Sequence, residues 1–336
     1  MTRGLVIGKF YPPHAGHKHL IETARAQADE LSVLVCERRD QEISGEQRAA
    51  WLRETHPGVI VRVIPDIERD DDSEAWAAHT SRYLGTPPDV VFTSEEYGPQ
   101  YARFMGARHV MVDPGRKQFP VSGKQIRENP AAYWQFLEPC VREYYAQRVC
   151  VIGAESTGTT TLAEALARHY QTAWVPEYGR YYTEATRYVR RGLEWTSDEF
   201  IHIAQMQNRW EDSLARVCNR ILFCDTDSFA TQLWHERYMG YLLPELEPLC
   251  ANRKYAMYLL TDVDIPYVQD AIRDGKNVRH AMHKRFEEEM RRRGKNFIVL
   301  SGRHTERMQR AVTACDALLR AGAENRTGAE AQKAPR

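Results

Sequence analysis

Two histidines near the N-terminus have the spacing of a phosphate-binding pair. They lie in the run 8–17, GKFYPPHAGH, so that His14 and His17 can both reach one phosphate. Gly8 lets the backbone approach that phosphate closely, and Lys9 adds a further cation. Transfer of a nucleotidyl group depends mainly on such charge stabilisation. The alternatives for the two histidines are a pair of metal ligands or ordinary solvated loop residues.

A second phosphate-binding signature lies in the middle of the chain, in the run 153–160, GAESTGTT. Gly153, Gly158 and Thr160 match the GxxxxGK[ST] template of a P-loop, whose amides cradle phosphate and whose final hydroxyl binds Mg²⁺. Thr159 occupies the position of the template's lysine. Loss of that cation is expected to weaken transition-state stabilisation by roughly 3 kcal/mol, as the loss of one electrostatic donor does in other enzymes.

Two acids follow an apolar strand in the second half of the chain. The run Ile221–Cys224 leads directly into Asp225 and then Asp227, which is typical of a metal and base site beside a P-loop. We assign Asp225 as the base and the acid on the metal side, and Asp227 as the partner of the substrate hydroxyl. The two roles can be exchanged, and an ordinary turn at the strand end is the alternative.

A third motif, VSGKQIRENP at 121–130, lies between the other two. It resembles the ISxxxIR motif of nucleotidylyltransferases, which implies that Ser122 and Arg127 hold the β- and γ-phosphates of ATP, with Lys124 beside them. Ser122 can equally serve only as the cap of a helix. The run 8–17 resembles the HxGH site of the same enzymes, which act on the α-phosphate of ATP, and this places Gly8 and Phe10 at the ATP site.

The elements that must position these motifs alternate along the whole chain. Short apolar runs alternate with helical patterns, which favours an α/β fold with parallel sheets. The strands are expected at Leu5–Ile7, Leu31–Cys36, Val59–Val63, Val90–Thr93, His109–Val112, Val149–Ile152, Thr172–Val175, Ile221–Cys224, Tyr255–Thr261 and Asn296–Leu300. Prominent helices are expected at His17–Gln27, Glu46–Glu54, Glu138–Gln147, Thr160–Tyr170, Ser197–Val217, Ala281–Arg293 and Arg303–Arg320.

The length of 336 residues indicates two domains. We place a Rossmann-like domain at 1–146, a P-loop kinase domain at 147–321 and a disordered tail at 322–336. The tail is rich in Ala, Gly, Glu and Lys and has no large apolar residue.

Together these motifs resemble one family, over about residues 3 to 320. The chain resembles the bifunctional nicotinamide-nucleotide adenylyltransferases and ribosylnicotinamide kinases of the NadR type, without their N-terminal helix-turn-helix domain. The resemblance implies that the first domain joins nicotinamide mononucleotide and ATP into NAD and pyrophosphate. It implies that the second domain uses MgATP to phosphorylate nicotinamide riboside. Mg²⁺ is then the expected cofactor, held by Thr160 and Asp225.

The resemblance also suggests substrate contacts in the first domain. Trp76 can stack on the nicotinamide ring, because a flat cation favours an aromatic face, although a core tryptophan is an equal alternative. Arg39, Asp40 and Arg48 follow the second predicted strand, and ligands collect at the carboxyl ends of strands in open α/β sheets.

Further pieces of the second domain resemble the kinase half of the family. The run 175–180, VPEYGR, resembles its PEYxR element, which implies substrate contacts for Glu177, Tyr178 and Arg180. The run 265–279 resembles its lid, in which Arg273 and Arg279 can supply part of the charge missing at Thr159. The remaining loop positions expected at the ATP phosphates are Glu155, Ser156, Thr157 and Thr161.

Composition limits the other classes of function. Basic and acidic residues balance at 46 each, so binding of nucleic acid through bulk charge is not expected. Seven cysteines without a CxxC pair fit a reduced, cytoplasmic protein. No membrane segment is expected, and the partners are small molecules, with a homo-oligomer possible.

Three alternative functions remain open. In the first, the adenylyltransferase is active while the second domain lacks catalysis and senses nucleotides, a reading that rests on Thr159. In the second, the chain is a transcriptional regulator, which the start of the first strand at residue 5 disfavours. In the third, the adenylyl acceptor is phosphopantetheine or FMN, which fits poorly with a separate P-loop domain.

Overall fold

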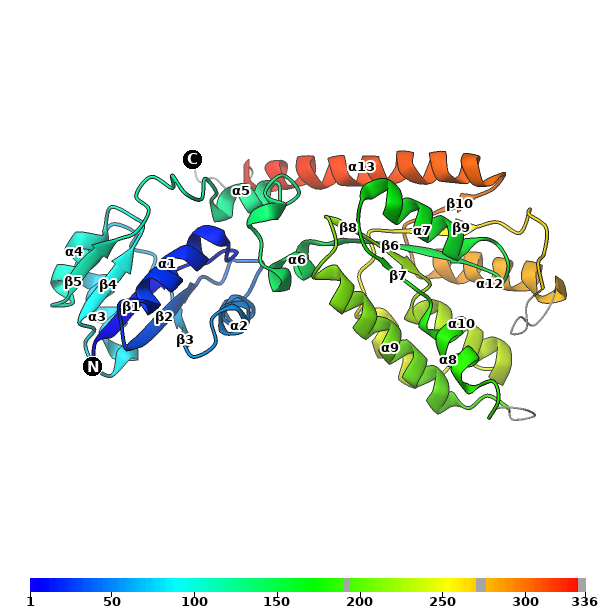
Figure 1. Ribbon diagram of the computed structural model, residues 1–336, viewed down its shortest axis with the longest axis horizontal. Coiled ribbons are helices and arrows are strands. Elements are labelled where there is room, and N and C mark those ends of the chain that lie inside the picture. Colours follow the sequence, from blue (N-terminus) through cyan, green and yellow to red (C-terminus); the bar gives the residue numbers. More distant parts are fainter. Residues whose placement is uncertain (190–193, 270–275, 332–336) are drawn as a thin grey trace. The chain divides into compact units, whose positions relative to one another are not determined.

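The computed structural model describes residues 1–189, 194–269 and 276–331. The chain divides into two compact units, whose main segments are Met1–Val141 and Arg142–Gly322. The division falls a few residues before the boundary predicted between 146 and 147. Each unit contains one five-stranded parallel sheet with helices on both faces (Figure 1), so the predicted pair of parallel α/β domains is confirmed.

The sheet of the first unit has the strand order β3-β2-β1-β4-β5. Its strands are β1 (Arg3–Gly8), β2 (Glu30–Glu37), β3 (Ile60–Pro65), β4 (Val90–Thr93) and β5 (Arg108–Met111). Its helices are α1 (Ala15–Arg25), α2 (Gly45–Thr55), α3 (Ser73–Leu84), α4 (Gly98–Phe104) and α5 (Gly123–Glu128). The strand order reverses at β1, between β2 and β4, and the GKFYPPHAGH motif begins where β1 ends. Such a switch point is where open α/β sheets bind ligands.

Alternating side chains of the strands form two cores, one on each face of this sheet. On one face, Val6 of β1 and Val33 of β2 pack against Ile21 of α1. On the other, Leu5 packs with Tyr101 of α4. This period of two along a parallel strand, with both faces covered, explains the nearly continuous apolar runs of the sequence.

The sheet of the second unit has the strand order β10-β9-β6-β8-β7. Its strands are β6 (Gln147–Gly153), β7 (Trp174–Val175), β8 (Ile221–Asp225), β9 (Met257–Thr261) and β10 (Phe297–Leu300). Its helices are α7 (Thr159–Tyr170), α8 (Tyr178–Thr186), α9 (Ser197–Ala215), α10 (Ser228–Met239), α11 (Glu247–Ala251), α12 (Arg279–Arg292) and α13 (His304–Ala331). A short helix, α6 (Pro139–Tyr145), precedes β6, and three 3₁₀ turns lie at Trp134–Phe136, Pro244–Leu246 and Lys276–Val278. Strand β6 is central, so the P-loop also follows a strand at a switch point.

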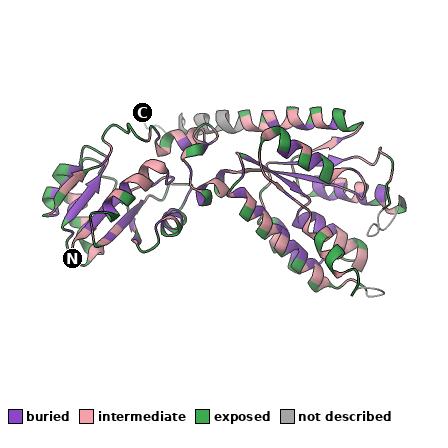
Figure 2. Ribbon diagram, in the orientation of Figure 1, coloured by how far each residue is buried: buried purple, intermediate pink, exposed green. Residues whose placement is uncertain are grey.

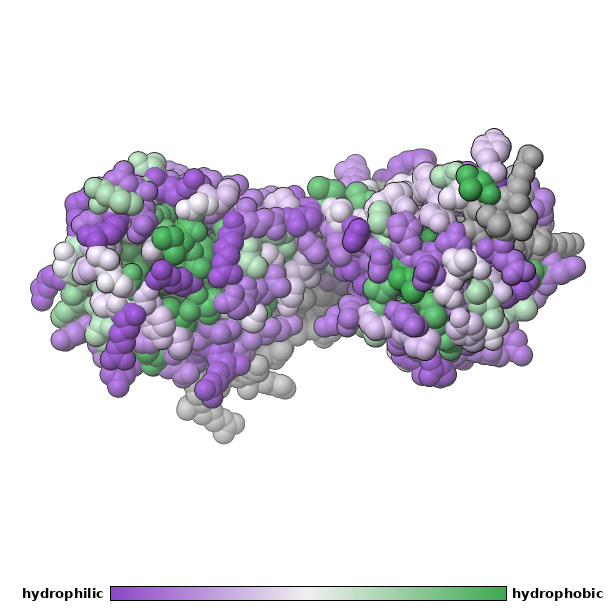
Figure 3. Space-filling model, turned by 90° about the horizontal axis from the view of Figure 1, so that it is seen from below, coloured by the Kyte–Doolittle hydropathy of each residue, from purple (hydrophilic) through white to green (hydrophobic). Residues whose placement is uncertain are grey.

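The second unit likewise has a core on each face of its sheet. Leu162 of α7 and Ala311 of α13 pack on Val151 from one side. Phe200 of α9 and Phe286 of α12 pack around Ile152 from the other. Buried residues therefore follow the strands, while exposed ones lie on the outer helix faces (Figure 2). The surface seen in Figure 3 is mostly hydrophilic, with hydrophobic residues in small separate groups.

All seven cysteines are free and buried in these cores. Burial in apolar surroundings raises the thiol pKa to about 12 at Cys36 and at Cys218, because the thiolate would lose its hydration. No disulfide is therefore part of the fold.

The ends of several elements differ from the sequence expectation. Strand β7 is only Trp174–Val175, shorter than the predicted Thr172–Val175. The backbone of Thr172 instead bonds to Ala167 as α7 ends. Helix α13 continues to Ala331, well into the segment predicted to be disordered. The high helix propensity of Ala and Glu allows a helix there without any apolar stripe.

Candidate active sites

The first site is built on the loop that joins β1 to α1. His14 is the N-cap of α1, and its Nδ1 accepts a hydrogen bond of 3.2 Å from the amide of Gly16. The rings of His14 and His17 lie with their centroids 3.8 Å apart. Phe10 meets the His17 ring edge-on at 5.0 Å. The predicted pairing of the two imidazoles is thus present.

Both imidazoles are neutral at ordinary pH. Burial lowers the pKa of His14 to about 3, and the charge of Arg116 contributes in the same direction. The pKa of His17 is lowered for the same two reasons and by its proximity to His14. Within the described residues, the buried Nδ1 of His17 has no hydrogen-bond partner. The pair can therefore donate neutral N–H bonds to an anion, and Arg116 is a cation that the sequence analysis did not identify.

The two nucleotide motifs of the first unit meet at Tyr11. Nη1 of Arg127 donates to the carbonyl oxygen of Tyr11 at 2.5 Å, and its guanidinium lies 4.3 Å from the centre of the Tyr11 ring. At Gly123 a Cβ atom would lie 2.3 Å from the same oxygen, so only glycine permits this close approach. Ser122 caps α5 by accepting from the amide of Gln125 at 3.2 Å. Lys124 is exposed on α5 and pairs with Glu128 at 3.6 Å.

Lys9 points toward two carboxylates that follow β3. Its Nζ lies 3.3 Å from Asp70 and 3.8 Å from Asp66. The side chain of Asp66 is fully buried, and its Oδ2 has no hydrogen-bond partner among the described residues. Asp66 belongs to none of the predicted motifs, and its place directly after a strand is the one sequence signal that points to it.

Arg48 differs from its predicted role as a substrate contact. It is fully buried, and its guanidinium donates to the carbonyl oxygens of Lys9 and Cys36 and, at 2.7 Å, to Gln41. Arg48 lies on α2, which contacts β2 and β3, and its guanidinium is directed to these protein oxygens. Arg48 therefore supports the loop after β1 instead of facing a ligand.

The other predicted substrate residues of this unit are Arg39, Asp40 and Trp76. Arg39 and Asp40 are exposed, and Asp40 pairs with Arg38 at 3.3 Å. Trp76 is half-buried against the core, and its indole N–H donates to the carbonyl of Arg69 at 2.8 Å.

The P-loop conformation of the second site is formed by residues 153–159. Gly158 has φ +85° and Ser156 has φ +58°, and only the first of these positions is glycine. The hydroxyl of Thr157 donates to the carbonyl of Ala154 at 2.6 Å and accepts from Thr261 at 2.7 Å. Glu155 is half-buried, and Thr161 is exposed on the first turn of α7.

Asp225, the last residue of β8, faces this loop. Thr160 donates its hydroxyl to Asp225 at 2.5 Å. Burial raises the pKa of Asp225 to about 6, against hydrogen bonds from Thr160 and Thr159 and the charge of Arg180. A carboxylate and a hydroxyl at this distance are the oxygen ligands that Mg²⁺ prefers. The described residues contain no cluster of three or more His, Cys, Asp or Glu side chains that would hold a transition metal.

Asp227 instead faces the core. One of its oxygens caps α10 by accepting from Ala230 N at 2.9 Å, and the other accepts from the Tyr258 hydroxyl at 2.9 Å. That hydroxyl accepts in turn from Lys295. The geometry therefore favours Asp225 as the reactive acid and gives Asp227 a structural role, in place of its predicted contact with a substrate hydroxyl.

Glu177, Tyr178 and Arg180 lie where α8 begins. The ring of Tyr178 meets Trp210 edge-on at 5.1 Å, and its hydroxyl lies 3.1 Å from the His202 ring nitrogen. Arg180 pairs with Glu184 at 3.1 Å, while its charge also acts on Asp225. His202 and Trp210 could not be found from the sequence, because their helix, α9, carries no motif.

Arg279 lies at the P-loop and is nearly buried. Its guanidinium donates to the carbonyl of Ser156 at 3.3 Å and to the carbonyl of Ile265 at 3.1 Å. The other predicted lid arginine, Arg273, lies outside the described residues.

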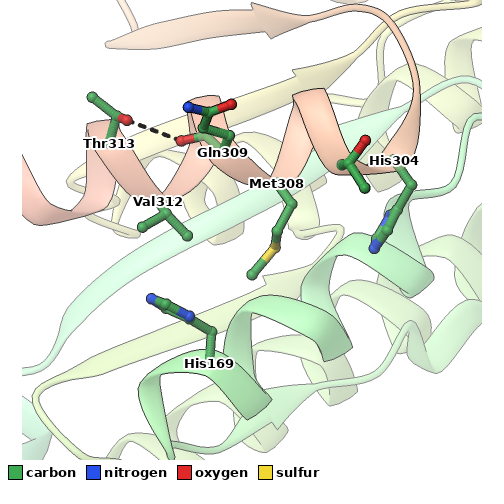
Figure 4. A pocket seen from close by; sticks show the side chains of 7 residues that line it. His169, His304, Met308, Gln309, Val312 and Thr313 are labelled. Carbon is green, nitrogen blue, oxygen red and sulfur yellow. Dashed lines mark hydrogen bonds between the residues drawn. The ribbon is translucent and has the colours of Figure 1, made fainter.

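A pocket of about 520 Å³ lies elsewhere on the second unit, between α7 and α13 (Figure 4). It contains none of the predicted site residues and is mainly apolar. It is lined by His169, His304, Thr305, Met308, Gln309, Val312 and Thr313. Among the described residues, no helix has the length and apolar character needed to cross a membrane.

Comparison with known proteins gives consistent results for both units. A family model described as cytidylyltransferase-like matches residues 5–170, and one described as an AAA domain matches 148–307. The trifunctional NAD biosynthesis/regulator protein NadR of Escherichia coli (strain K12) is 30% identical over 294 residues, covering 81% of this chain and 72% of that protein.

Two solved structures share the fold. A NadR protein in complex with NAD and AMP-PNP superposes with a TM-score of 0.73 at 22% identity, over 95% of this chain and 96% of that one. A NadR protein in complex with NR also has a TM-score of 0.73, at 21% identity, over 90% of this chain and 89% of that one.

Proposed function

Since this chain belongs to the NadR family of NAD biosynthesis, we propose that it catalyses two consecutive steps toward NAD. The second unit transfers the γ-phosphate of ATP to the 5′-hydroxyl of nicotinamide riboside. The first unit then joins the resulting mononucleotide to the adenylyl group of a second ATP, releasing pyrophosphate.

The observation that carries the first activity is the meeting of two motifs at Tyr11. The histidine pair follows Tyr11 in the same loop, and Arg127 of the second motif donates to the Tyr11 carbonyl. In the reaction, a phosphate oxygen of the mononucleotide forms a bond to the α-phosphorus of ATP as the bond to pyrophosphate breaks. Neutral N–H donors from His14 and His17 stabilise the charge that develops on the α-phosphate, while Lys9, Arg116 and Arg127 are cations for the leaving group.

The second activity is supported by the position of Asp225 beside the P-loop. Its carboxylate accepts the proton of the riboside hydroxyl while that oxygen attacks the γ-phosphorus and ADP leaves. Mg²⁺, when bound by Thr160 and Asp225, supplies charge to the transferring phosphate. Arg180 lies close enough to influence Asp225, and the aromatic side chains around Tyr178 offer a face to the flat nicotinamide cation.

A second candidate function follows from Thr159. If the threonine leaves too little positive charge at the γ-phosphate, the second unit binds nucleotide without transferring phosphate and acts as a sensor. This alternative keeps the adenylyl transfer of the first unit.

Two assays on the purified protein separate these functions. NAD formation from nicotinamide mononucleotide and MgATP tests the first unit, and ADP release that depends on nicotinamide riboside tests the second. Activity in both assays supports the proposal. Activity in the first alone, at saturating MgATP, supports the sensor. Failure of the first assay contradicts the proposed adenylyl transfer.

A further inference from the structure

The carbonyl groups of the P-loop are held by side chains from outside the loop. The carbonyl of Thr157 accepts from Nη1 of Arg307 at 2.6 Å, and that of Ser156 accepts from Nη2 of Arg279 at 3.3 Å. In a planar trans peptide the C=O and the following N–H point in opposite directions. Fixing these two oxygens therefore aims the amides of Thr157 and Gly158 away from the arginines. Within the described residues, neither amide donates a hydrogen bond.

Arg307 connects three loops at the carboxyl edge of the sheet. Besides Thr157, it donates from Nε to the carbonyl of Gly302 at 2.9 Å and from Nη2 to the carbonyl of Asp262 at 3.0 Å. These residues follow β10 and β9. The side chain is 3% exposed, and it forms an ion pair with Asp264. Asp264 neutralises the positive charge of Arg307 locally. The guanidinium therefore acts on the loop mainly through the fixed directions of its N–H donors.

The segment after β9 lies against the loop at the same place. Val268 donates its amide to the Ser156 hydroxyl at 2.8 Å. Arg279 holds the carbonyl of Ile265 together with that of Ser156. Thr159, in the lysine position of the template, lies close enough to Asp225 to lower the pKa of that carboxyl.

We propose that Arg307, assisted by Arg279, is the positioning residue that keeps the P-loop amides directed toward nucleotide phosphate in a loop with threonine at 159. The inference rests on the proposed nucleotide site of the second unit. Arg307 lies on α13 and belongs to no phosphate-binding motif.

The test measures nucleotide binding at the loop itself. Hydrogen exchange followed by mass spectrometry on the full chain reports the peptide that covers residues 153–162 during titration with MgADP. Because the readout is local, nucleotide bound by the first unit does not contribute. The concentration that gives half-maximal protection is compared between the native protein and its variants.

Arg307→Met is expected to raise the MgADP concentration for half-maximal protection by about thirty-fold. Arg307→Lys is expected to raise it by about tenfold, because an ammonium group cannot donate to several carbonyl groups in the fixed directions of a guanidinium. Adding Thr159→Lys to Arg307→Met restores protection to within about threefold of the native value. Thr159→Lys alone changes it by less than about threefold. The matched control is Arg310→Met, three residues along α13, whose guanidinium donates to Val299 at 2.8 Å and not to the P-loop.

A purely structural role for Arg307 would also predict damage, but without rescue by Thr159→Lys. The inference is overturned by that lack of rescue, by protection unchanged in Arg307→Met, or by an equal loss in Arg310→Met. It is overturned as well if MgADP gives the native loop no protection. Protection without riboside phosphorylation would contradict the kinase and leave the role of Arg307 intact. If the Arg307→Met protein still phosphorylates the riboside and its loop keeps native protection, the kinase is supported and the role of Arg307 is contradicted.

Discussion

The histidine pair of the first site is uncharged, although it binds an anion in the proposed reaction. Burial and the neighbouring Arg116 lower the pKa of both rings. Neutral imidazoles avoid the cost of burying an imidazolium charge and still offer N–H donors to phosphate. In the proposed reaction, Lys9, Arg116 and Arg127 supply the positive charge that pyrophosphate requires.

Replacing His17 by alanine is expected to stop NAD formation, because one of two preorganised donors at the α-phosphate is lost. The expected loss exceeds about a hundredfold in kcat/KM, or roughly 2.7 kcal/mol. Initial rates of NAD formation measure it. Riboside phosphorylation in the same protein should be unchanged.

His19→Ala is the matched control, since His19 lies on the same helix, packs near Phe119 at 5.4 Å and belongs to neither motif. A His17→Ala protein with more than about a tenth of native adenylyl transfer would show that the pair is not essential.

Asp225 lowers the stability of the second unit at neutral pH. Its pKa rises from 3.8 to about 6 on folding, so the ionised carboxylate opposes folding above pH 6. The effect disappears below pH 3.8, where folded and unfolded states both hold the proton. In metal-free buffer, Asp225→Asn should therefore increase the free energy of unfolding at pH 7.5 by about 2–3 kcal/mol, and by less at pH 5. Urea unfolding at the two pH values measures this, and riboside phosphorylation is lost in the variant.

Asp227→Ala provides the contrast within two residues. Removing the cap of α10 and the acceptor of the Tyr258 hydroxyl is expected to lower stability by about 1–3 kcal/mol. Each folded molecule should still phosphorylate the riboside. Equal stabilisation by the two substitutions, or loss of phosphorylation in both, would contradict the assignment of Asp225 as the reactive acid and Asp227 as a structural residue.

At the scale of the elements, α5 must lie against the loop after β1 for the first site to exist. Gly123→Ala places a methyl group on the carbonyl of Tyr11 and should separate Arg127 from the histidine pair without removing any phosphate-binding side chain. NAD formation is expected to fall by at least about tenfold. Riboside phosphorylation by the other unit is the internal control. Native rates of NAD formation in this variant would show that the close approach is not needed.

The sequence pattern predicted the elements better than their side-chain directions. Strand β8 and helices α7 and α9 begin within a residue of the predicted positions, because apolar periodicity and a capping residue are local signals. The inward turn of Arg48 and the contact of Arg307 with Thr157 depend on how a helix packs across strands far away in the sequence. The spacing of residues in the sequence cannot reveal such contacts. Both arginines donate to backbone carbonyl groups, which are the same at every residue and so leave no sequence pattern.

The whole molecule has two units, each with its own two-sided core and its own predicted site. Mixing His17→Ala with Asp225→Asn protein should therefore restore NAD formation from nicotinamide riboside and ATP, with a lag while mononucleotide accumulates. Chromatography of the nucleotides over time measures this, and each variant alone gives no NAD. A mixture that makes no NAD, although each protein keeps its own half-reaction, would mean that the intermediate does not pass through solution.

The reactivity of the buried thiols can report local unfolding of each unit. Cys36 and Cys140 lie in the first unit, and Cys150, Cys218, Cys224, Cys250 and Cys315 in the second. Since a folded core shields a thiol and raises its pKa, a maleimide should modify each cysteine only when its surroundings unfold. Peptide mapping after timed labelling would give separate opening rates for the two units in one unmodified protein. The same protection leaves a clean background for a dye attached to a single cysteine introduced on the surface.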